Sequence, residues 1–209
     1  MGMIVLLVLA AILVFWLVGA YNSLVSLRNQ VYNAWKQIDV QLKRRHDLIP
    51  NLVETVKGAM AFERETLEAV IAARNQAIAT MQLPAPGAEG AGGAPSPRLV
   101  QQTAQAEGQL TAALGRLFAV VEAYPDLKAT GNVAQLQEEL TSTENKIAFA
   151  RQLYNDTATQ YNTKQQQFPT NLVAGLAKAT PAELWEITDV AERAVPKVDL
   201  SLNPPKVEH

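Results

Sequence analysis

The sequence offers one internal histidine for acid–base chemistry. His46 stands between Arg45 and Asp47, and the other histidine, His209, is the last residue. An imidazole beside a carboxylate can act as a general base. A single histidine in a helical stretch is more commonly a hydrogen-bonded or solvated side chain. We therefore expect no catalytic role for it.

The residue types also argue against a metal centre. The chain has no cysteine, and its two histidines form no His-x-x-x-His or carboxylate-x-x-His pair on one helix face. We therefore expect no metal and no other cofactor. The net charge of -2 lacks the basic field that draws proteins to phosphate backbones, so nucleic acid is not an expected partner.

Two arginines fall on positions that the apolar pattern assigns to helical seams, the apolar lines along one face of each helix. A buried guanidinium is costly unless it is paired, so Arg45 and Arg74 should each meet a carboxylate or an amide. Glu144 is the expected partner for one of them. The candidate polar residues are Arg45, Asn51, Arg74, Glu144, Asn145, Arg151, Tyr154, Asn155, Tyr161 and Asn162.

Three interpretations of these polar residues stay open. They could form a polar layer that fixes the register of the helices. They could instead form a surface for a partner or a second copy, or line a small-ligand pocket. Under the first interpretation, replacing Arg45 or Glu144 with alanine would destabilise the domain.

The elements that must position these residues begin with a predicted transmembrane helix at residues 1–21. No charged side chain occurs before Arg28, and residues 3–18 form an unbroken apolar run. At about 1.5 Å per residue, residues 1–21 reach roughly 30 Å, the thickness of a hydrocarbon core. A cleaved signal peptide is the alternative, because residues 18–20 resemble a cleavage site. The lack of a preceding basic residue and the direct continuation as helix favour an anchor.

The basic residues predict the orientation of this anchor. None precedes the span, whereas Arg28, Lys36, Lys43, Arg44 and Arg45 follow it. Short flanks rich in lysine and arginine tend to stay in the cytoplasm. We expect the N-terminus outside and the helical domain in the cytoplasm.

Apolar residues at spacings of three and four predict long amphipathic helices after the span. The first should continue from the span through Pro50, kinked there but unbroken. A second should follow from about residue 63, and a third from about residue 98 to 123. The seam expected on the second helix is Leu67, Ile71, Arg74, Ile78 and Met81.

The fourth helix shows the most regular pattern, with an apolar residue every seven positions. A short helix is expected at residues 171–178, and the Thr180-Pro181-Ala182-Glu183 string predicts the start of another at residues 184–193. The seven-residue series is Val133, Leu140, Ile147, Tyr154, Tyr161 and Phe168.

These elements predict an all-α protein in which an N-terminal transmembrane helix continues into an antiparallel four-helix bundle with coiled-coil-like spacing. Residues 1–21 would be the anchor and residues 22–180 the bundle. A Pro, Gly and Ala loop would occupy residues 83–97. Residues 181–209 would form a short helix and an extended tail.

Several strings occur in a defined order along nearly the whole chain, and together they resemble the LemA family. The loop at 83–97 and the segment after Thr180 match the family pattern least. The strings are Tyr21-Asn22, Asp47 to Val53, Thr143 to Ala148, Tyr154-Asn155, Tyr161-Asn162, Phe168-Pro169 and Pro196-Lys197-Val198.

The resemblance implies a single-span protein of the bacterial cytoplasmic (inner) membrane, with a helical domain and no established catalytic activity. It also implies a link to membrane biogenesis through magnetosome-associated relatives. We expect a noncatalytic scaffold or assembly protein of the envelope that contacts the lipid bilayer, self-associates as a homo-oligomer, and binds a membrane-protein partner. The alternative is an adaptor or sensor for a membrane protease or signalling system.

Overall fold

The computed structural model describes residues 1–58, 63–82, 94–124, 131–177 and 179–186. Helices are the only regular elements in these ranges, which confirms the predicted all-α class with a long apolar helix at the N-terminus. The helices are α1 (Gly2–Lys57), α2 (Arg64–Met81), α3 (Pro97–Glu122), α5 (Gly131–Gln166) and α6 (Thr170–Leu176).

Helix α1 is a single element of 56 residues that passes through Pro50 without a break, which confirms the predicted continuity. The kink at Pro50 stays a prediction. Residues 1–15 are exposed, and α1 is the one helix in the described part of the chain that is long and apolar enough to cross a membrane. The apolar segment and the first helix of the domain are therefore one rod.

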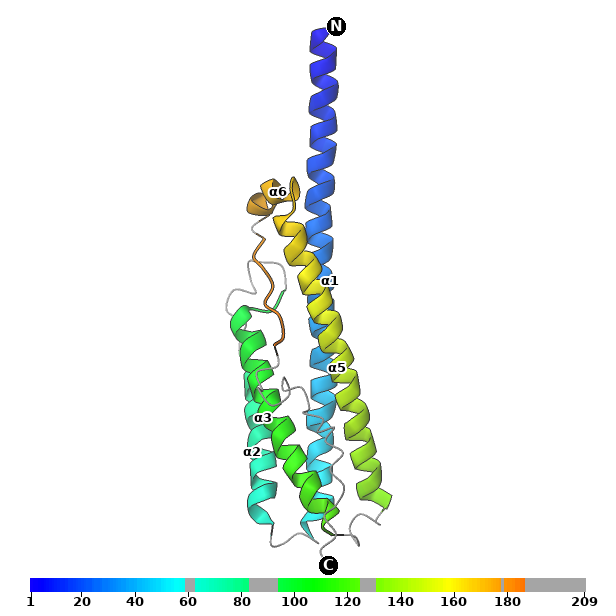
Figure 1. The fold of residues 1–209 in the computed structure, drawn as a ribbon, viewed down its shortest axis with the longest axis vertical. Helices are drawn as coiled ribbons and strands as arrows, with labels where there is room; N and C mark the ends of the chain where they lie inside the picture. The colour runs from blue at the N-terminus through cyan, green and yellow to red at the C-terminus, as the bar shows by residue number, and fades with distance from the viewer. Residues whose placement is uncertain (59–62, 83–93, 125–130, 178, 187–209) are drawn as a thin grey trace, which may run out of the picture.

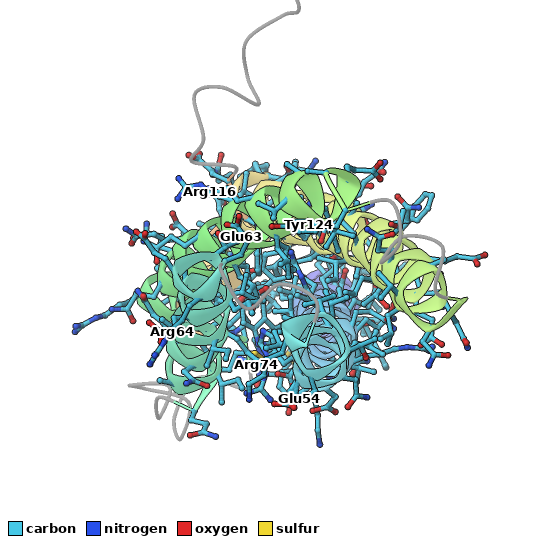
Figure 2. The ribbon with its side chains drawn as sticks, turned by 90° about the horizontal axis from the view of Figure 1, so that it is seen from below. Glu54, Glu63, Arg64, Arg74, Arg116 and Tyr124 are labelled. Atoms are coloured by element: carbon cyan, nitrogen blue, oxygen red, sulfur yellow. The ribbon has the colours of Figure 1, made fainter. Side chains whose placement is uncertain are left out.

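The helices pack as two long pairs. Helix α5 lies along α1, and α3 lies along α2, each running opposite to its neighbour (Figure 1). Helix α6 contacts both α1 and α5. Seen along the rod, charged side chains such as Glu54, Arg64 and Arg116 lie on the outside (Figure 2). The more detailed prediction of a four-helix bundle, and the division at residues 21 and 180, stay predictions.

Buried apolar residues form two clusters along the rod. The lower core joins Ile49 to Val56 of α1 with α2, α3 and the first half of α5. The upper core joins Leu24 to Leu42 of α1 with the second half of α5 and Trp185. The sequence also predicts a seam on α1, and all of its apolar positions are buried, as are the positions spaced by seven from Val133 to Tyr161. The α1 seam is Val31, Trp35, Ile38, Leu42, Ile49, Leu52 and Val56.

Two of the predicted seam positions are wrong. Ile71 is 42% exposed, because α2 buries Leu67, Val70 and Ala77 instead. Phe168 is 80% exposed, because α5 ends at Gln166, before the last position of the seven-residue series. In the alanine-rich α2, small side chains allow close packing, so the bulkiest residues do not by themselves mark the buried face.

The helix predicted at residues 184–193 is wrong where it can be compared. Residues 181–186 are not helical, and residues 187–193 lie outside the described part of the chain. The loop predicted at 83–97 also lies mainly outside it. Its last residues lead into α3, where the Ser96 hydroxyl accepts a 3.2 Å hydrogen bond from the Leu99 N–H and Pro97 opens the helix.

Candidate functional site

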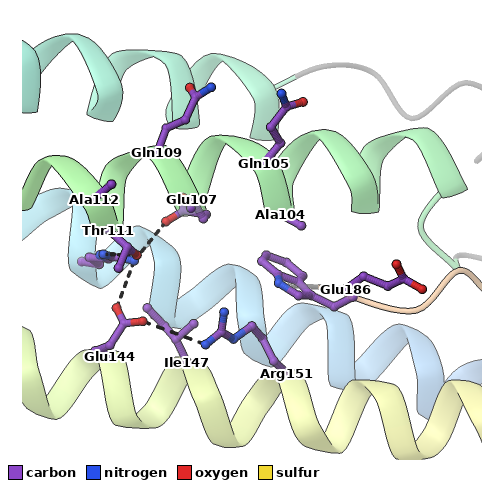
Figure 3. Close-up of a pocket in the computed structure, with 13 residues that line it drawn as sticks. Ala104, Gln105, Glu107, Gln109, Thr111, Ala112, Glu144, Ile147, Arg151 and Glu186 are labelled. Atoms are coloured by element: carbon purple, nitrogen blue, oxygen red, sulfur yellow. Dashed lines mark hydrogen bonds and ion pairs between the residues drawn. The ribbon is translucent and has the colours of Figure 1, made fainter. Parts of the chain in front are cut away.

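A buried polar layer separates the lower core from the upper core. It joins three helices, with Arg45 and His46 from α1, Glu107 and Thr111 from α3, and Glu144 from α5. Figure 3 shows Glu107, Thr111 and Glu144 converging from α3 and α5. Arg45 falls between Leu42 and Ile49 on α1, and Glu144 falls between Leu140 and Ile147 on α5. The layer therefore brings one turn each of α1, α3 and α5 against the other two, and its role in fixing the register of the helices stays a prediction.

Arg45 is the centre of this polar layer. Its Nη1 atom lies 3.0 Å from Glu144 Oε2 and 3.4 Å from Glu107 Oε2. Its Nη2 atom donates a 2.8 Å hydrogen bond to the Thr111 hydroxyl. Arg45 is only 4% exposed, so these contacts replace most of its hydration. Glu144 is thus the partner of one of the two seam arginines.

His46 shares Glu107 with Arg45. Its Nε2 atom lies 2.7 Å from Glu107 Oε1, and both side chains are buried. A histidine–carboxylate pair can orient a base, but a base must reach a substrate to act. Burial and the bond to Glu107 suit His46 to holding that carboxylate in place. Among the described residues, no three acidic or histidine side chains are grouped to hold a metal ion.

Arg74 meets α1 through its backbone and compensates for Pro50. A proline has no N–H, so the carbonyl four residues earlier in its helix, that of His46, lacks its helical donor. The Nε atom of Arg74 donates a 2.7 Å hydrogen bond to this carbonyl oxygen. Figure 2 shows Arg74 lying between α2 and α1. Arg74 of α2 therefore supplies the hydrogen-bond donor that Pro50 of α1 lacks.

We expect the effects of Arg74→Met and Pro50→Ala on the free energy of unfolding to be non-additive. Arg74→Met should lower the free energy of unfolding by about 1–3 kcal/mol, because it leaves a buried carbonyl unpaired. In a Pro50→Ala background the new N–H can bond to the same carbonyl, so Arg74→Met should cost about 1 kcal/mol less. Urea unfolding of the four chains in detergent measures this difference. Equal effects of Arg74→Met in both backgrounds would contradict the pairing.

A second set of polar contacts holds residues 179–186, which we call the strap, against α5. Asn155 donates from Nδ2 to the Trp185 carbonyl at 3.0 Å and accepts from its N–H at 2.8 Å. Asn162 makes the same two bonds to Ala182, both at 2.8 Å. Seven helical residues rise roughly 10.5 Å, and three extended residues span roughly 10 Å. The asparagine spacing therefore matches the backbone of an extended chain.

Aromatic side chains complete the contact between the strap and the upper core. Trp185 is buried, and its ring centre lies 6.0 Å from that of Trp35. The Tyr154 hydroxyl donates a 2.6 Å hydrogen bond to the Glu183 carbonyl, and burial, with a smaller effect from the Glu183 charge, raises the pKa of that hydroxyl. Burial also raises the pKa of the Tyr161 hydroxyl. Both hydroxyls thus stay protonated at neutral pH.

Arg151 links the polar layer to the strap. Its Nη2 atom lies 4.0 Å from Glu144 Oε1, and its guanidinium carbon lies 6.0 Å from the centre of the Trp185 ring. A cavity of about 390 Å³ opens at this junction, lined by side chains of both charges (Figure 3). The interpretation as a small-ligand pocket stays a prediction.

The predicted site residues thus divide into separate groups. Arg45, Glu144 and Arg151 meet at the layer, Arg74 lies beside it on His46, and the Tyr and Asn pairs lie on α5, where Tyr154, Asn155 and Asn162 bind the strap. Asn51 and Asn145 are exposed and belong to neither group. Sequence reasoning missed Glu107 and Thr111. Glu107 could have been found, because it extends the buried series of Leu110, Leu114 and Leu117 by one more step of three.

Comparison with known proteins places this geometry in a family. The model of the LemA family matches residues 34–200. The chain belongs to the LemA family. The matched region of this LemA-family chain contains the whole polar layer and the strap.

Named relatives come from two groups of LemA-like proteins. Protein LemA of Metamycoplasma hominis is 29% identical over 162 residues, which cover 77% of this chain and 66% of the relative. Magnetosome protein MamQ 2 of Paramagnetospirillum magneticum is 25% identical over 181 residues, which cover 79% and 64%. Magnetosome protein MamQ of Magnetospirillum gryphiswaldense is 27% identical over 168 residues, which cover 74% and 60%.

This LemA-family chain spans slightly less than two thirds of the length of these relatives. None of their names denotes an enzyme. Family membership and the exposed apolar part of α1 together indicate a membrane-associated protein.

Proposed function

We propose that this LemA-family chain is a noncatalytic scaffold of the bacterial cytoplasmic membrane, anchored by residues 1–21, that self-associates through the outer face of α1 and α5. The observation that carries this proposal is a group of exposed apolar side chains on that face. Val40 of α1 is 61% exposed, and Phe149 and Leu153 of α5 are 73% and 42% exposed. Grouped apolar side chains on a surface mark interaction sites, whereas single ones are ordinary.

The groove between these side chains has an apolar centre, charged residues around it and a polar atom that is unpaired within the described ranges, as expected of a surface that a partner covers. Lys36 and Lys146 stand on its lining, so charge surrounds an apolar centre. The Gln41 carbonyl oxygen of the side-chain amide is buried at the same groove and has no hydrogen-bond partner among the described residues. A protein that covers the groove can supply a donor to that oxygen.

A second copy of this chain is the partner that best fits the groove. Copies anchored in one bilayer are confined to one plane with their domains at the same height, which raises their effective concentration. A two-fold contact brings the same face of both copies together, so Val40, Phe149 and Leu153 would meet themselves. Asn145 is exposed one turn before Phe149 on α5 and would lie at the edge of this contact.

The orientation rests on the basic residues that follow the apolar segment. Arg28 and Lys36 are the first charged side chains after residue 21, and a cytoplasmic domain is the arrangement that such flanks favour. In this orientation the domain works at the inner face of the membrane, and the N-terminus lies outside.

Sedimentation of the full chain in detergent tests the self-association. We expect the unsubstituted chain to sediment as an oligomer and Phe149→Glu to sediment as a monomer, because a carboxylate at the centre of an apolar contact cannot be hydrated there. Ile71→Glu is the matched control, since Ile71 is also exposed but lies on α2. It should leave the oligomer unchanged.

Two results would overturn the proposal. One is a strictly monomeric unsubstituted chain at high concentration, and the other is an oligomer that survives Phe149→Glu. Crosslinking from Phe149 to a distinct membrane protein, with no product from two copies, would favour the alternative role of an adaptor or sensor for a membrane protease or signalling system.

A further inference from the structure

The domain covers α1 before the apolar run has ended. Residues 1–15 of α1 are exposed, whereas Trp16 and Leu17 are half-buried and Ala20 is buried. Helix α6 contacts α1 and lies at the end of the domain from which the exposed part of α1 emerges (Figure 1). Ala174 of α6 packs in the same cluster as Leu24 of α1. The turn that contains α6 is therefore a neighbour of the last part of the apolar run.

The length of the apolar run fixes the height of α6 relative to a bilayer. About 20 helical residues are needed to cross a hydrocarbon core, and residues 1–21 supply hardly more than that. If these residues cross the core, Trp16 lies roughly 7.5 Å inside it and Ala20 lies at its edge. Helix α6, which packs at the same height, then lies at the level of the lipid headgroups.

The residues around the start of α6 have the side-chain types that are expected at the level of the lipid headgroups. Phe168 is 80% exposed and Leu172 is 63% exposed, while Val173 on the other side of α6 is buried. No charged residue occurs between Lys164 and Lys178 in the sequence. Apolar side chains flanked by lysines are typical of segments that lie in the membrane interface, where the ammonium groups meet lipid phosphates.

We propose that the corner formed by Phe168 and Leu172 inserts into the headgroup region of the same bilayer that α1 crosses. The domain then holds the membrane at two points, the anchor and this corner. The inference rests on the anchoring role proposed above, but not on self-association. Its consequence is a fixed tilt of the rod, because one helix alone leaves the tilt free and a second contact removes that freedom.

Single-site spin labelling of the full chain tests this contact. The chain has no cysteine, so a cysteine introduced at one position is the only thiol to label. Phe168→Cys, Leu172→Cys, Ile71→Cys and Val8→Cys would each carry a nitroxide in phosphatidylethanolamine and phosphatidylglycerol vesicles. Collision with oxygen reports lipid, and collision with a water-soluble nickel chelate reports water. Ile71 is the matched control, because it is also exposed but lies on α2, toward the other end of the domain from α6 and outside the proposed contact between copies.

We expect the ratio of oxygen to nickel collisions at Phe168→Cys and Leu172→Cys to exceed that at Ile71→Cys several-fold. Equal ratios at the three positions, with a lipid-like ratio at Val8→Cys, would overturn the corner contact and leave the anchor intact. A water-like ratio at Val8→Cys would overturn the anchor and the corner together. Protection of Phe168→Cys from both reagents would mean that protein covers the corner, which also overturns the proposal.

Discussion

Replacing Glu107 with alanine is expected to lower the free energy of unfolding by about 3–5 kcal/mol, the largest loss from any single change in the polar layer. Glu107 is buried and serves both Arg45 and His46. Its removal leaves His46 Nε2 without this partner and leaves the Arg45 guanidinium facing one remaining carboxylate, that of Glu144, which is 36% exposed. The cost comes from an undercompensated buried cation rather than from the lost contact alone.

Thermal unfolding of the full chain in detergent measures this loss. For a chain of this size, 3–5 kcal/mol corresponds to a fall in Tm of roughly 6–20 °C. Glu138→Ala removes an exposed glutamate from α5 and is the matched control, with little expected change in Tm. Glu144→Ala should fall between the two, because water already hydrates part of that carboxylate. Unchanged Tm values in both Glu107→Ala and Arg45→Ala would remove the polar layer as a structural device.

The second large effect is expected at the strap. Trp185→Ala should cost about 3–5 kcal/mol, as is usual for a buried indole, because it removes the side chain that fills the upper core beside Trp35 and Tyr154. The Asn155 and Asn162 bonds would then hold a strap with little apolar burial. Thermal unfolding again gives the measurement, and the hydrogen-exchange protection of the Ala182 N–H, which bonds to the Asn162 side chain, reports whether the strap has detached.

Leu184→Ala provides the control for the strap. Leu184 is the neighbour of Trp185 but is 38% exposed, so its truncation should cost far less. If Trp185→Ala and Leu184→Ala lower the Tm equally, the strap does not complete the upper core. Asn155→Ala with Asn162→Ala should fall between them, since it removes hydrogen bonds while leaving the indole in place.

The long helices could be predicted from the sequence because burial repeats along them without interruption. Val31 to Val56 on α1 and Val133 to Tyr161 on α5 each present one face to the core, and large side chains mark that face. Helix α2 has fewer large side chains and several alanines. Its buried face was therefore assigned wrongly at Ile71, although its position was right.

The candidate site was only partly predictable, because its contacts join distant segments. Arg45 stood out as a charge on an apolar seam. Glu107 also continues a seam, that of α3, but nothing in the sequence indicates which distant side chains it meets. The string around Pro181 has the residues of a helix start, but local preference is weak. Four backbone bonds to Asn155 and Asn162 and the burial of Trp185 outweigh it, and the segment is extended.

Because α1 is unbroken from Gly2 to Lys57, the rotation of its N-terminal apolar segment about the helix axis also determines the rotation of the domain at its other end. Each residue of an α-helix rotates the chain by about 100° around the helix axis and advances it by about 1.5 Å along that axis. One residue inserted between the apolar run and Leu24 would swing the whole domain around the axis of the rod by that angle. If α1 anchors the chain as proposed, it sets the direction in which the domain faces as well as the distance of the domain from the membrane.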